Sequence, residues 1–203
     1  MLDRRALKII KPTLATAARR LHRANIKADQ ITVTGFAIGM LALPAIALEY
    51  YALGAVLILL NRLCDGLDGE VARLSKATNR GAYLDIVLDF IFYSAIVFAF
   101  ALANPGTNAL PAAALIFSFM GTGSSFLAFA ILAERLQLSS MNYPNKGFYY
   151  LNGITEGTET ILFLLSFCLF PTWFAPLAWV FFTLCVVTTF TRVIGGAHTL
   201  NHD

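Results

Sequence analysis

The stretch from Asn61 to Phe90, NRLCDGLDGEVARLSKATNRGAYLDIVLDF, decides how this chain folds. It places four aspartates against the ends of two strongly apolar segments: Asp65, Asp68, Asp85 and Asp89. An isolated aspartate at the centre of a membrane helix costs about 2.5–3.5 kcal/mol. Four of them close to a membrane therefore need a partner that neutralises their charge.

The composition of the whole chain is that of an integral membrane protein. Of its 203 residues, 58% are hydrophobic and 13% are charged, whereas about a quarter of an ordinary soluble domain is charged. A bilayer core requires roughly 20 apolar residues per helix. Six segments meet this length, and they predict an all-α, polytopic membrane protein with six transmembrane helices: 31–50, 52–75, 81–103, 109–133, 150–170 and 173–197.

The basic residues predict the orientation of these segments. Eight of the 15 Lys and Arg precede the first segment, and the connections after the first, third and fifth segments contain none. Because basic residues mark the cytoplasmic side of a membrane, we expect both termini and the four aspartates to face the cytoplasm. The predicted location is the inner membrane.

We expect the chain to form a single domain over residues 1–203, with a membrane helix bundle over residues 29–203. Residues 1–28 alternate basic and apolar side chains, which is typical of a helix lying on an anionic membrane surface. We expect Pro12 to interrupt this helix early on or to start a second piece of it, and Asp29 to cap the first membrane helix. The alternative for residues 1–28 is a solvated tail that only sets orientation.

The spacing of the aspartates predicts a metal site. Asp65 and Asp68 are three residues apart, and Asp85 and Asp89 are four apart, so each pair projects from one face of a helix. Four converging carboxylates repel each other, and two divalent cations would balance them. Oxygen ligands suit Mg²⁺, Mn²⁺ or Ca²⁺, and a pair of such ions clamps the attacking and leaving oxygens in phosphoryl transfer.

Small residues lie on the same helical faces as the two aspartate pairs, and they allow another helix or a ligand to approach closely. These are Gly69, Ala72 and Gly81. The alternative for the acids is a buried salt-bridge network, in which they would pair with Arg62, Arg73 and Arg80. That alternative leaves the small residues and the paired spacing unexplained.

The same residues resemble the signature of the CDP-alcohol phosphotransferase family. The pattern is Asp65-x2-Asp68-Gly69-x2-Ala72-Arg73 followed by Gly81-x3-Asp85-x3-Asp89, with eight fixed positions in 25 residues. The connection between Arg73 and Gly81 is shorter than the family pattern leads us to expect.

The resemblance implies a metal-dependent transferase of phospholipid synthesis. It would move a phosphoalcohol group from a CDP-alcohol, here expected to be CDP-diacylglycerol, to an acceptor alcohol and release CMP. The expected metals are two Mg²⁺ or Mn²⁺ ions, with Ca²⁺ binding but inhibiting. The resemblance also implies a homodimer, and no nucleic-acid partner is expected.

The resemblance assigns roles to the signature residues. Asp65, Asp68, Asp85 and Asp89 would hold the metals, and Asp89 would also act as the general base on the acceptor hydroxyl. The nucleotide would be bound by Asp68, Gly69, Ala72, Arg73 and Gly81.

The acceptor site is predicted from charges outside the signature. Arg135, Lys146 and Arg192 fall at the same expected end of three segments and could form a pocket for a phosphorylated acceptor, or could only enforce orientation. Glu156 and Glu159 could bind an amine or polyol acceptor, such as serine for the amine, or they could pair with Arg192 or form hydrogen bonds between helices. Glycerol 3-phosphate, inositol phosphate and serine all remain open, although a Lys-x-Lys-Thr pattern associated with glycerol phosphate is absent from LQLSSMNYPNKG.

A cation transporter or Mg²⁺ channel is the main alternative function, because acids within apolar segments suit it as well. However, the four acids cluster at one expected membrane face and do not line a path across. A non-catalytic scaffold is a third reading, and it predicts that the acids are dispensable.

Overall fold

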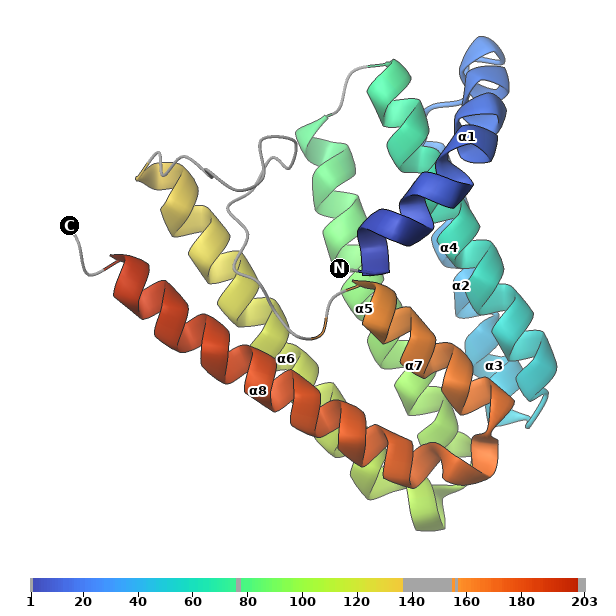
Figure 1. The fold of residues 1–203 in the computed structure, drawn as a ribbon. Helices are drawn as coiled ribbons and strands as arrows, with labels where there is room; N and C mark the ends of the chain where they lie inside the picture. Colours follow the sequence, from blue (N-terminus) through green and yellow to red (C-terminus); the bar gives the residue numbers. More distant parts are fainter. Residues whose placement is uncertain (1, 76–77, 137–154, 156, 201–203) are drawn as a thin grey trace.

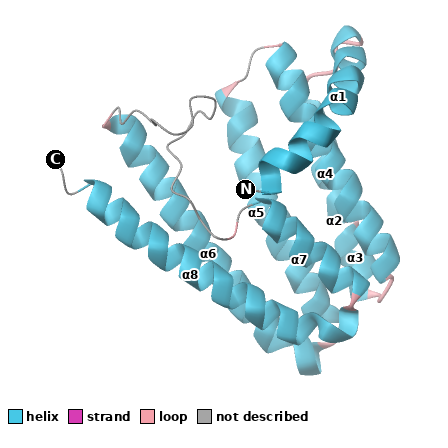
Figure 2. Ribbon diagram, in the orientation of Figure 1, coloured by secondary structure: helices cyan, strands magenta, loops and turns pink. Residues whose placement is uncertain are grey.

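The computed structural model describes residues 2–75, 78–136, 155 and 157–200, with side chains from Thr13 onward. Within these ranges the chain is helical, with no strand (Figures 1 and 2). The elements, in chain order, are α1 (Leu2–Arg23), α2 (Ala28–Met40), α3 (Ala42–Ala47), α4 (Tyr51–Leu74), α5 (Asn79–Ala103), α6 (Pro105–Arg135), α7 (Gly157–Leu169), the short 3₁₀ helix η1 (Pro171–Trp173) and α8 (Phe174–Leu200).

The helices confirm an all-α, polytopic membrane protein. Among the residues that the structure describes, four helical stretches are long and apolar enough to cross a membrane, namely Ala28–Ala47, Asn79–Ala103, Pro105–Arg135 and Pro171–Leu200. The helix α4 has 24 residues, but it carries the charged residues of the signature. The described part of α7 has 13 residues. Whether α4 and α7 complete six spans stays a prediction.

The first predicted span is divided into α2 and α3 at Leu41. Pro44 explains the break, because proline lacks an amide hydrogen and its ring clashes with the carbonyl four residues earlier. The helix α2 begins after Lys27, whose amide donates to the side chain of Gln30 at 2.9 Å. The prediction that Asp29 caps this helix is therefore wrong. Asp29 lies in the first turn, and its carboxylate is 3.6 Å from Nε of Arg80.

The helix α1 packs across the bundle by its apolar side. Leu14 and Ala18 are buried, and Leu14 lies against Gly66 of α4. Arg19 and Arg20 are exposed on the other side. The helix runs from Leu2 to Arg23 without a break, so Pro12 does not end it: one lost backbone hydrogen bond does not end a helix whose neighbouring bonds remain. Figure 1 shows α1 changing direction part-way along its length.

A cluster of aromatic rings lies where α5, α7 and α8 meet. The Phe100 ring of α5 stacks on Phe174 of α8 with centroids 4.8 Å apart and meets Phe167 of α7 at 5.8 Å. All three rings are fully buried. We refer to Phe100, Phe167 and Phe174 as the aromatic end, because they hold α5, α7 and α8 together there.

The bundle opens toward the opposite end. Figure 1 shows α6 and α8 side by side and diverging from α4 and α5 toward the C-terminus. The helices α2 and α4 stay in close contact, since a side chain added at Gly35 would collide with Cys64. At Gly123 of α6 an added Cβ would lie 2.8 Å from the ring of Phe90, which keeps α5 against α6. Polar residues of the signature lie at this open end.

Candidate active site

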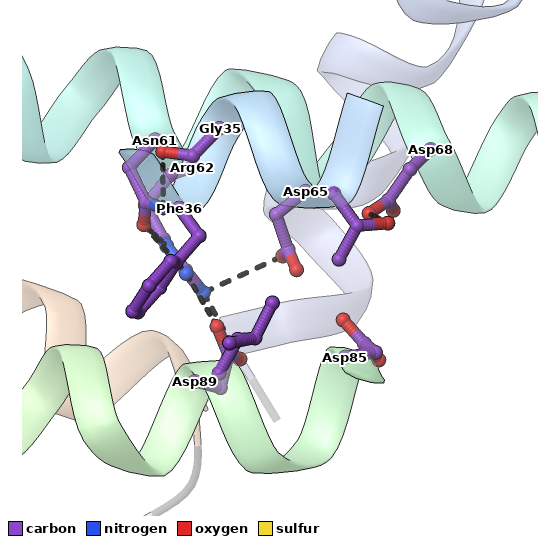
Figure 3. Close-up of a pocket in the computed structure, with 10 residues that line it drawn as sticks. Gly35, Phe36, Asn61, Arg62, Asp65, Asp68, Asp85 and Asp89 are labelled. Carbon is purple, nitrogen blue, oxygen red and sulfur yellow. Dashed lines mark hydrogen bonds and ion pairs between the residues drawn. The ribbon is translucent and has the colours of Figure 1, made fainter. Parts of the chain in front are cut away.

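The helices α4 and α5 present their aspartates to each other. Asp65 and Asp68 project from α4, and Asp85 and Asp89 project from the facing side of α5 (Figure 3). The helical spacing expected from the sequence explains this arrangement. The helix α2 completes the pocket, whose lining includes Thr32, Gly35 and Phe36.

Three of the four aspartates form a cluster. Asp65, Asp68 and Asp85 each offer a carboxylate oxygen, and these oxygens lie within 4.8 Å of one another. Oxygen ligands stand about 2.0–2.6 Å from Mg²⁺ or Ca²⁺, so oxygens on opposite sides of one ion are about 4–5 Å apart. The three carboxylates therefore fit a shared divalent cation. We call Asp65, Asp68 and Asp85 the three-aspartate cluster.

Asp89 makes different contacts. Its Oδ1 accepts a hydrogen bond from Nη2 of Arg62 at 2.5 Å, and its Oδ2 accepts from Nη1 at 3.2 Å. The hydroxyl of Tyr93, one helical turn further on α5, donates to the same Oδ2 at 2.8 Å. The structure thus brings Asp89 beside the cluster, paired with a guanidinium and a phenol.

The salt-bridge network considered as an alternative is mostly absent from the described residues. Arg73 pairs with Glu70 at 2.7 Å, and Arg80 pairs with Asp29. Arg62 is the described arginine that reaches the four aspartates: besides Asp89, it lies 3.5 Å from Asp65. With all four carboxylates ionised, as metal ligands are, the one guanidinium leaves a formal surplus of three negative charges in the pocket.

Sequence reasoning missed two side chains of this site and gave Arg62 only a structural role. The Thr32 hydroxyl on α2 donates to Asp68 at 2.5 Å, and Tyr93 contacts Asp89. Tyr93 follows Asp89 by four residues and Arg62 precedes Asp65 by three, so helical spacing could have indicated both. Thr32 had no such signal, because it comes from a different helix.

The predicted nucleotide-binding residues continue along α4 and α5 from Asp68. In front of Gly69 there is open space: an added Cβ would meet the guanidinium of Arg73 at 3.8 Å and nothing nearer. Ala72 is half-buried on the same helix. At Gly81 an added Cβ would lie 3.1 Å from Oδ1 of Asp29, so this glycine admits a side chain of α2. Nucleotide binding by these residues stays a prediction.

A second cavity adjoins the cluster, with a volume of about 210 Å³. It lies between α5, α6, α8 and the first turn of α7, and Asp85 and Asp89 belong to the lining of both hollows. Its walls combine aromatic rings with polar groups: Phe90, Tyr93, Phe119, Phe126, Thr122, Thr155, Thr160 and Arg192. A single water needs about 10–15 Å³, so this cavity has room for a small organic molecule.

The predicted acceptor residues fall in different places. Arg192 is buried and lines the second cavity, where its Nη1 donates to the carbonyl of Thr122 at 3.1 Å and its guanidinium lies over the Phe126 ring. Arg135 is exposed at the end of α6 and is not in the lining of this cavity. Glu159 is half-buried in the first turn of α7. Lys146 and Glu156 lie outside the described residues.

With this geometry in place, comparison with known proteins identifies the family. The sequence model of the CDP-alcohol phosphatidyltransferase family matches residues 25–191. The chain belongs to this family. It is 54% identical over 200 residues to the inner membrane protein YnjF of Escherichia coli strain K12. The match covers 98% of this chain and 97% of that protein. It is 28% identical to the phosphatidylcholine synthase of Mesorhizobium japonicum, over 92% of this chain and 66% of that one.

The fold is also similar to a solved structure. The crystal structure of the Mycobacterium tuberculosis phosphatidylinositol phosphate synthase, with CDP-DAG bound, superposes with a TM-score of 0.63. The match covers 89% of each chain at 22% sequence identity. At that identity the likeness concerns the fold.

Family membership confirms the predicted class of reaction. The protein is a metal-dependent membrane transferase of phospholipid synthesis, which moves a phosphoalcohol group from a CDP-alcohol to an acceptor alcohol with release of CMP. The transporter or channel alternative is not favoured by this membership. The apolar helices and the inner-membrane relative agree with a multi-pass membrane protein.

Proposed function

We propose that the donor is CDP-diacylglycerol and that the reaction takes place on two divalent cations, Mg²⁺ or Mn²⁺, held at the three-aspartate cluster with Asp89 beside them. The observation that supports this proposal is the approach of the three carboxylate oxygens to within 4.8 Å. The surplus of three negative charges exceeds the charge of one divalent ion, which favours two. When bound, the ions supply the positive charge that stabilises the pyrophosphate oxygens as CMP leaves.

The residues of the chain perform the remaining tasks of the transfer. Asp89 accepts the proton of the acceptor hydroxyl. The acceptor oxygen forms a bond to the phosphorus that carries the diacylglycerol, the bond from that phosphorus to the oxygen of CMP breaks, and CMP leaves with the electron pair. Arg73, which faces the open space beside Gly69, contacts the pyrophosphate, and Ala72 and Gly81 belong to the nucleotide site.

The acceptor enters the second cavity. Asp89 lies at its boundary with the cluster, which places the proton acceptor beside the incoming hydroxyl. Arg192 is the basic residue among its described lining residues, and a buried guanidinium prefers an anionic partner. We therefore propose an alcohol that carries a phosphate or a carboxylate. Arg135, Lys146 and Glu156 stay predicted acceptor residues.

The active site and both termini face the cytoplasm. In Figure 1 the end of α1, the end of α4, the start of α5 and the C-terminal ends of α6 and α8 lie on the upper side of the bundle, and the connections at the lower end contain no Lys or Arg. Cysteines introduced at Asn79 and at Thr172 test this orientation in sealed cells. A membrane-impermeant maleimide should label Thr172→Cys and not Asn79→Cys, and the reverse would contradict it.

The test of function is an assay with purified protein. Protein in detergent, Mg²⁺ or Mn²⁺, labelled CDP-diacylglycerol and a panel of alcohols should release CMP with one of them. The panel contains glycerol 3-phosphate, inositol phosphate, serine and choline, so a preference for choline would contradict an anionic acceptor. Ion flux across liposomes without CMP release would contradict the enzymatic function. Cross-linking in the membrane tests the proposed homodimer.

A further inference from the structure

The contact between Arg62 and Asp89 is the strongest feature of the pocket that the metal-binding and nucleotide-binding assignments do not use. We propose that Arg62 is a positioning residue for the transfer: its guanidinium holds the carboxylate of Asp89 at the wall between the three-aspartate cluster and the second cavity. The inference rests on the proposed function, in which Asp89 accepts the proton of the acceptor.

Both oxygens of Asp89 are engaged. Arg62 contacts Oδ1 and Oδ2 with two different nitrogens, at 2.5 and 3.2 Å, which is the paired geometry that fixes a carboxylate in one plane. The hydroxyl of Tyr93, which lies on α5 one turn after Asp89, donates to Oδ2 at 2.8 Å. Asp89 therefore has a single orientation in the pocket, and that orientation is set by side chains from two helices.

Arg62 is itself held firmly. The Asn61 side-chain oxygen accepts from Nε at 2.9 Å and from Nη2 at 2.6 Å. The Asn61 amide in turn donates to the carbonyl of Gly35 on α2 at 3.0 Å. The guanidinium lies 5.3 Å from the ring centroids of both Phe92 and Tyr93. A chain of contacts thus runs from the backbone of α2 through Asn61 and Arg62 to Asp89.

These contacts require an arginine. A lysine carries its charge on a single nitrogen and cannot contact both carboxylate oxygens and the Asn61 oxygen in one plane. The Arg62 side chain is 15% exposed, so its removal leaves a space that solvent does not easily fill. With Arg62 shortened, Asp89 would keep only the Tyr93 hydroxyl and would be free to turn toward the cluster.

The position of Asp89 matters because its side chain lines both the pocket at the three-aspartate cluster and the second cavity. Its neighbours on one side are the metal-binding carboxylates, and on the other side it faces the acceptor cavity. Misplacement of a catalytic group by about 1 Å lowers a rate by roughly a hundredfold. A role confined to stability does not explain this geometry, since a buried ion pair adds little net stability over well-packed apolar side chains.

The experiment compares Arg62→Gln, Arg62→Lys and Tyr93→Phe with the matched control Arg80→Gln, which removes an exposed arginine that also pairs with an aspartate. We expect kcat to fall by about a hundredfold in Arg62→Gln, less in Arg62→Lys, least in Tyr93→Phe and not at all in Arg80→Gln. The KM for CDP-diacylglycerol should stay within about threefold, because Arg62 lies away from Gly69 and Arg73.

Binding of Mn²⁺ to the protein without substrate supplies a second measurement. Loss of a positive charge beside the cluster should leave Mn²⁺ affinity unchanged or raise it in Arg62→Gln, whereas a collapsed site would lower it. The inference is overturned if Arg62→Gln keeps its kcat, or if kcat, Mn²⁺ affinity and melting temperature all fall together. If Arg62→Gln does not fold, an undiminished kcat in both Arg62→Lys and Tyr93→Phe overturns it equally. Absence of CMP release from the unaltered protein would instead contradict the proposed function.

Discussion

The two ends of the bundle are built in opposite ways. At the aromatic end, Phe100, Phe167 and Phe174 are fully buried and their rings are in direct contact. At the other end, α6 and α8 diverge from α4 and α5 (Figure 1), and the second cavity there is lined by two aspartates, threonines and Arg192 together with aromatic rings. Apolar packing at the aromatic end stabilises the bundle, so the helices at the other end can be separated by a cavity that contains charged residues.

This contrast predicts that substitutions at the aspartate end change the chemistry and that substitutions at the aromatic end change stability. The outcomes below test that division, in order of their expected effect on turnover.

Removal of the metal should have the largest effect. With EDTA in excess, we expect CMP release to fall to background, because the three-aspartate cluster then holds uncompensated negative charge where the pyrophosphate must bind. Added Mg²⁺ or Mn²⁺ should restore it. Turnover that persists in EDTA would show that the cluster is not a metal site needed for the reaction.

Asp89→Asn should have the next largest effect. The amide keeps the size of the carboxylate but cannot accept the proton, so kcat should fall by about 10²–10⁴-fold, while binding of Mn²⁺ and of the nucleotide is retained. Glu134→Gln, at an exposed position on α6, is the matched control that removes one acid elsewhere. Full turnover of Asp89→Asn would remove Asp89 from the role of general base.

Arg192→Gln should affect the acceptor alone. A hydrogen bond to a charged group contributes about 1.5–3 kcal/mol, so loss of the guanidinium should raise the KM for an anionic acceptor by roughly tenfold or more, with the KM for CDP-diacylglycerol unchanged. The KM of Arg135→Gln for the acceptor, measured in the same assay, gives the effect of removing the exposed arginine at the end of α6. An equal KM for the acceptor in Arg192→Gln and the unaltered protein would contradict acceptor binding at Arg192.

Phe174→Ala should leave kcat unchanged and lower stability. Lipid is as apolar as a phenylalanine side chain, so the loss comes from packing and from the cavity, and we expect a decrease of about 2 kcal/mol in the free energy of unfolding. Phe117→Ala, at a ring that is 72% exposed, is the control and should change it little. The measurement is thermal unfolding in detergent. A large loss of kcat in Phe174→Ala without loss of stability would contradict the prediction that the aromatic end affects stability alone.

Much of the fold and of the site could be predicted because the signals are local. Runs of apolar residues mark membrane helices whatever their neighbours are, and spacings of three and four residues place two aspartates on one helical face. These two rules led to the all-α bundle and to the predicted convergence of four aspartates. The structure brings the carboxylate oxygens of Asp65, Asp68 and Asp85 within 4.8 Å of one another, whereas Asp89 is paired with Arg62 beside them.

The incorrect details concern places where local signals compete. Asp29 is a favoured capping residue, but the helix starts one residue before it and Asp29 is 3.6 Å from Arg80. Pro12 is a helix breaker in general, yet α1 continues through it.

The sequence by itself determined the membrane class, the family and the faces of α4 and α5 on which the aspartates lie, because each depends on residues close together in the chain. Only the tertiary structure decided that Asp89 of α5 is paired with Arg62 of α4, that Thr32 contacts Asp68, and that a second cavity opens beside Asp85 and Asp89. These depend on how far α2, α6 and α8 are rotated and displaced relative to α4 and α5. That rotation is fixed by packing between segments distant in sequence, such as Gly35 against Cys64 and Gly123 against Phe90.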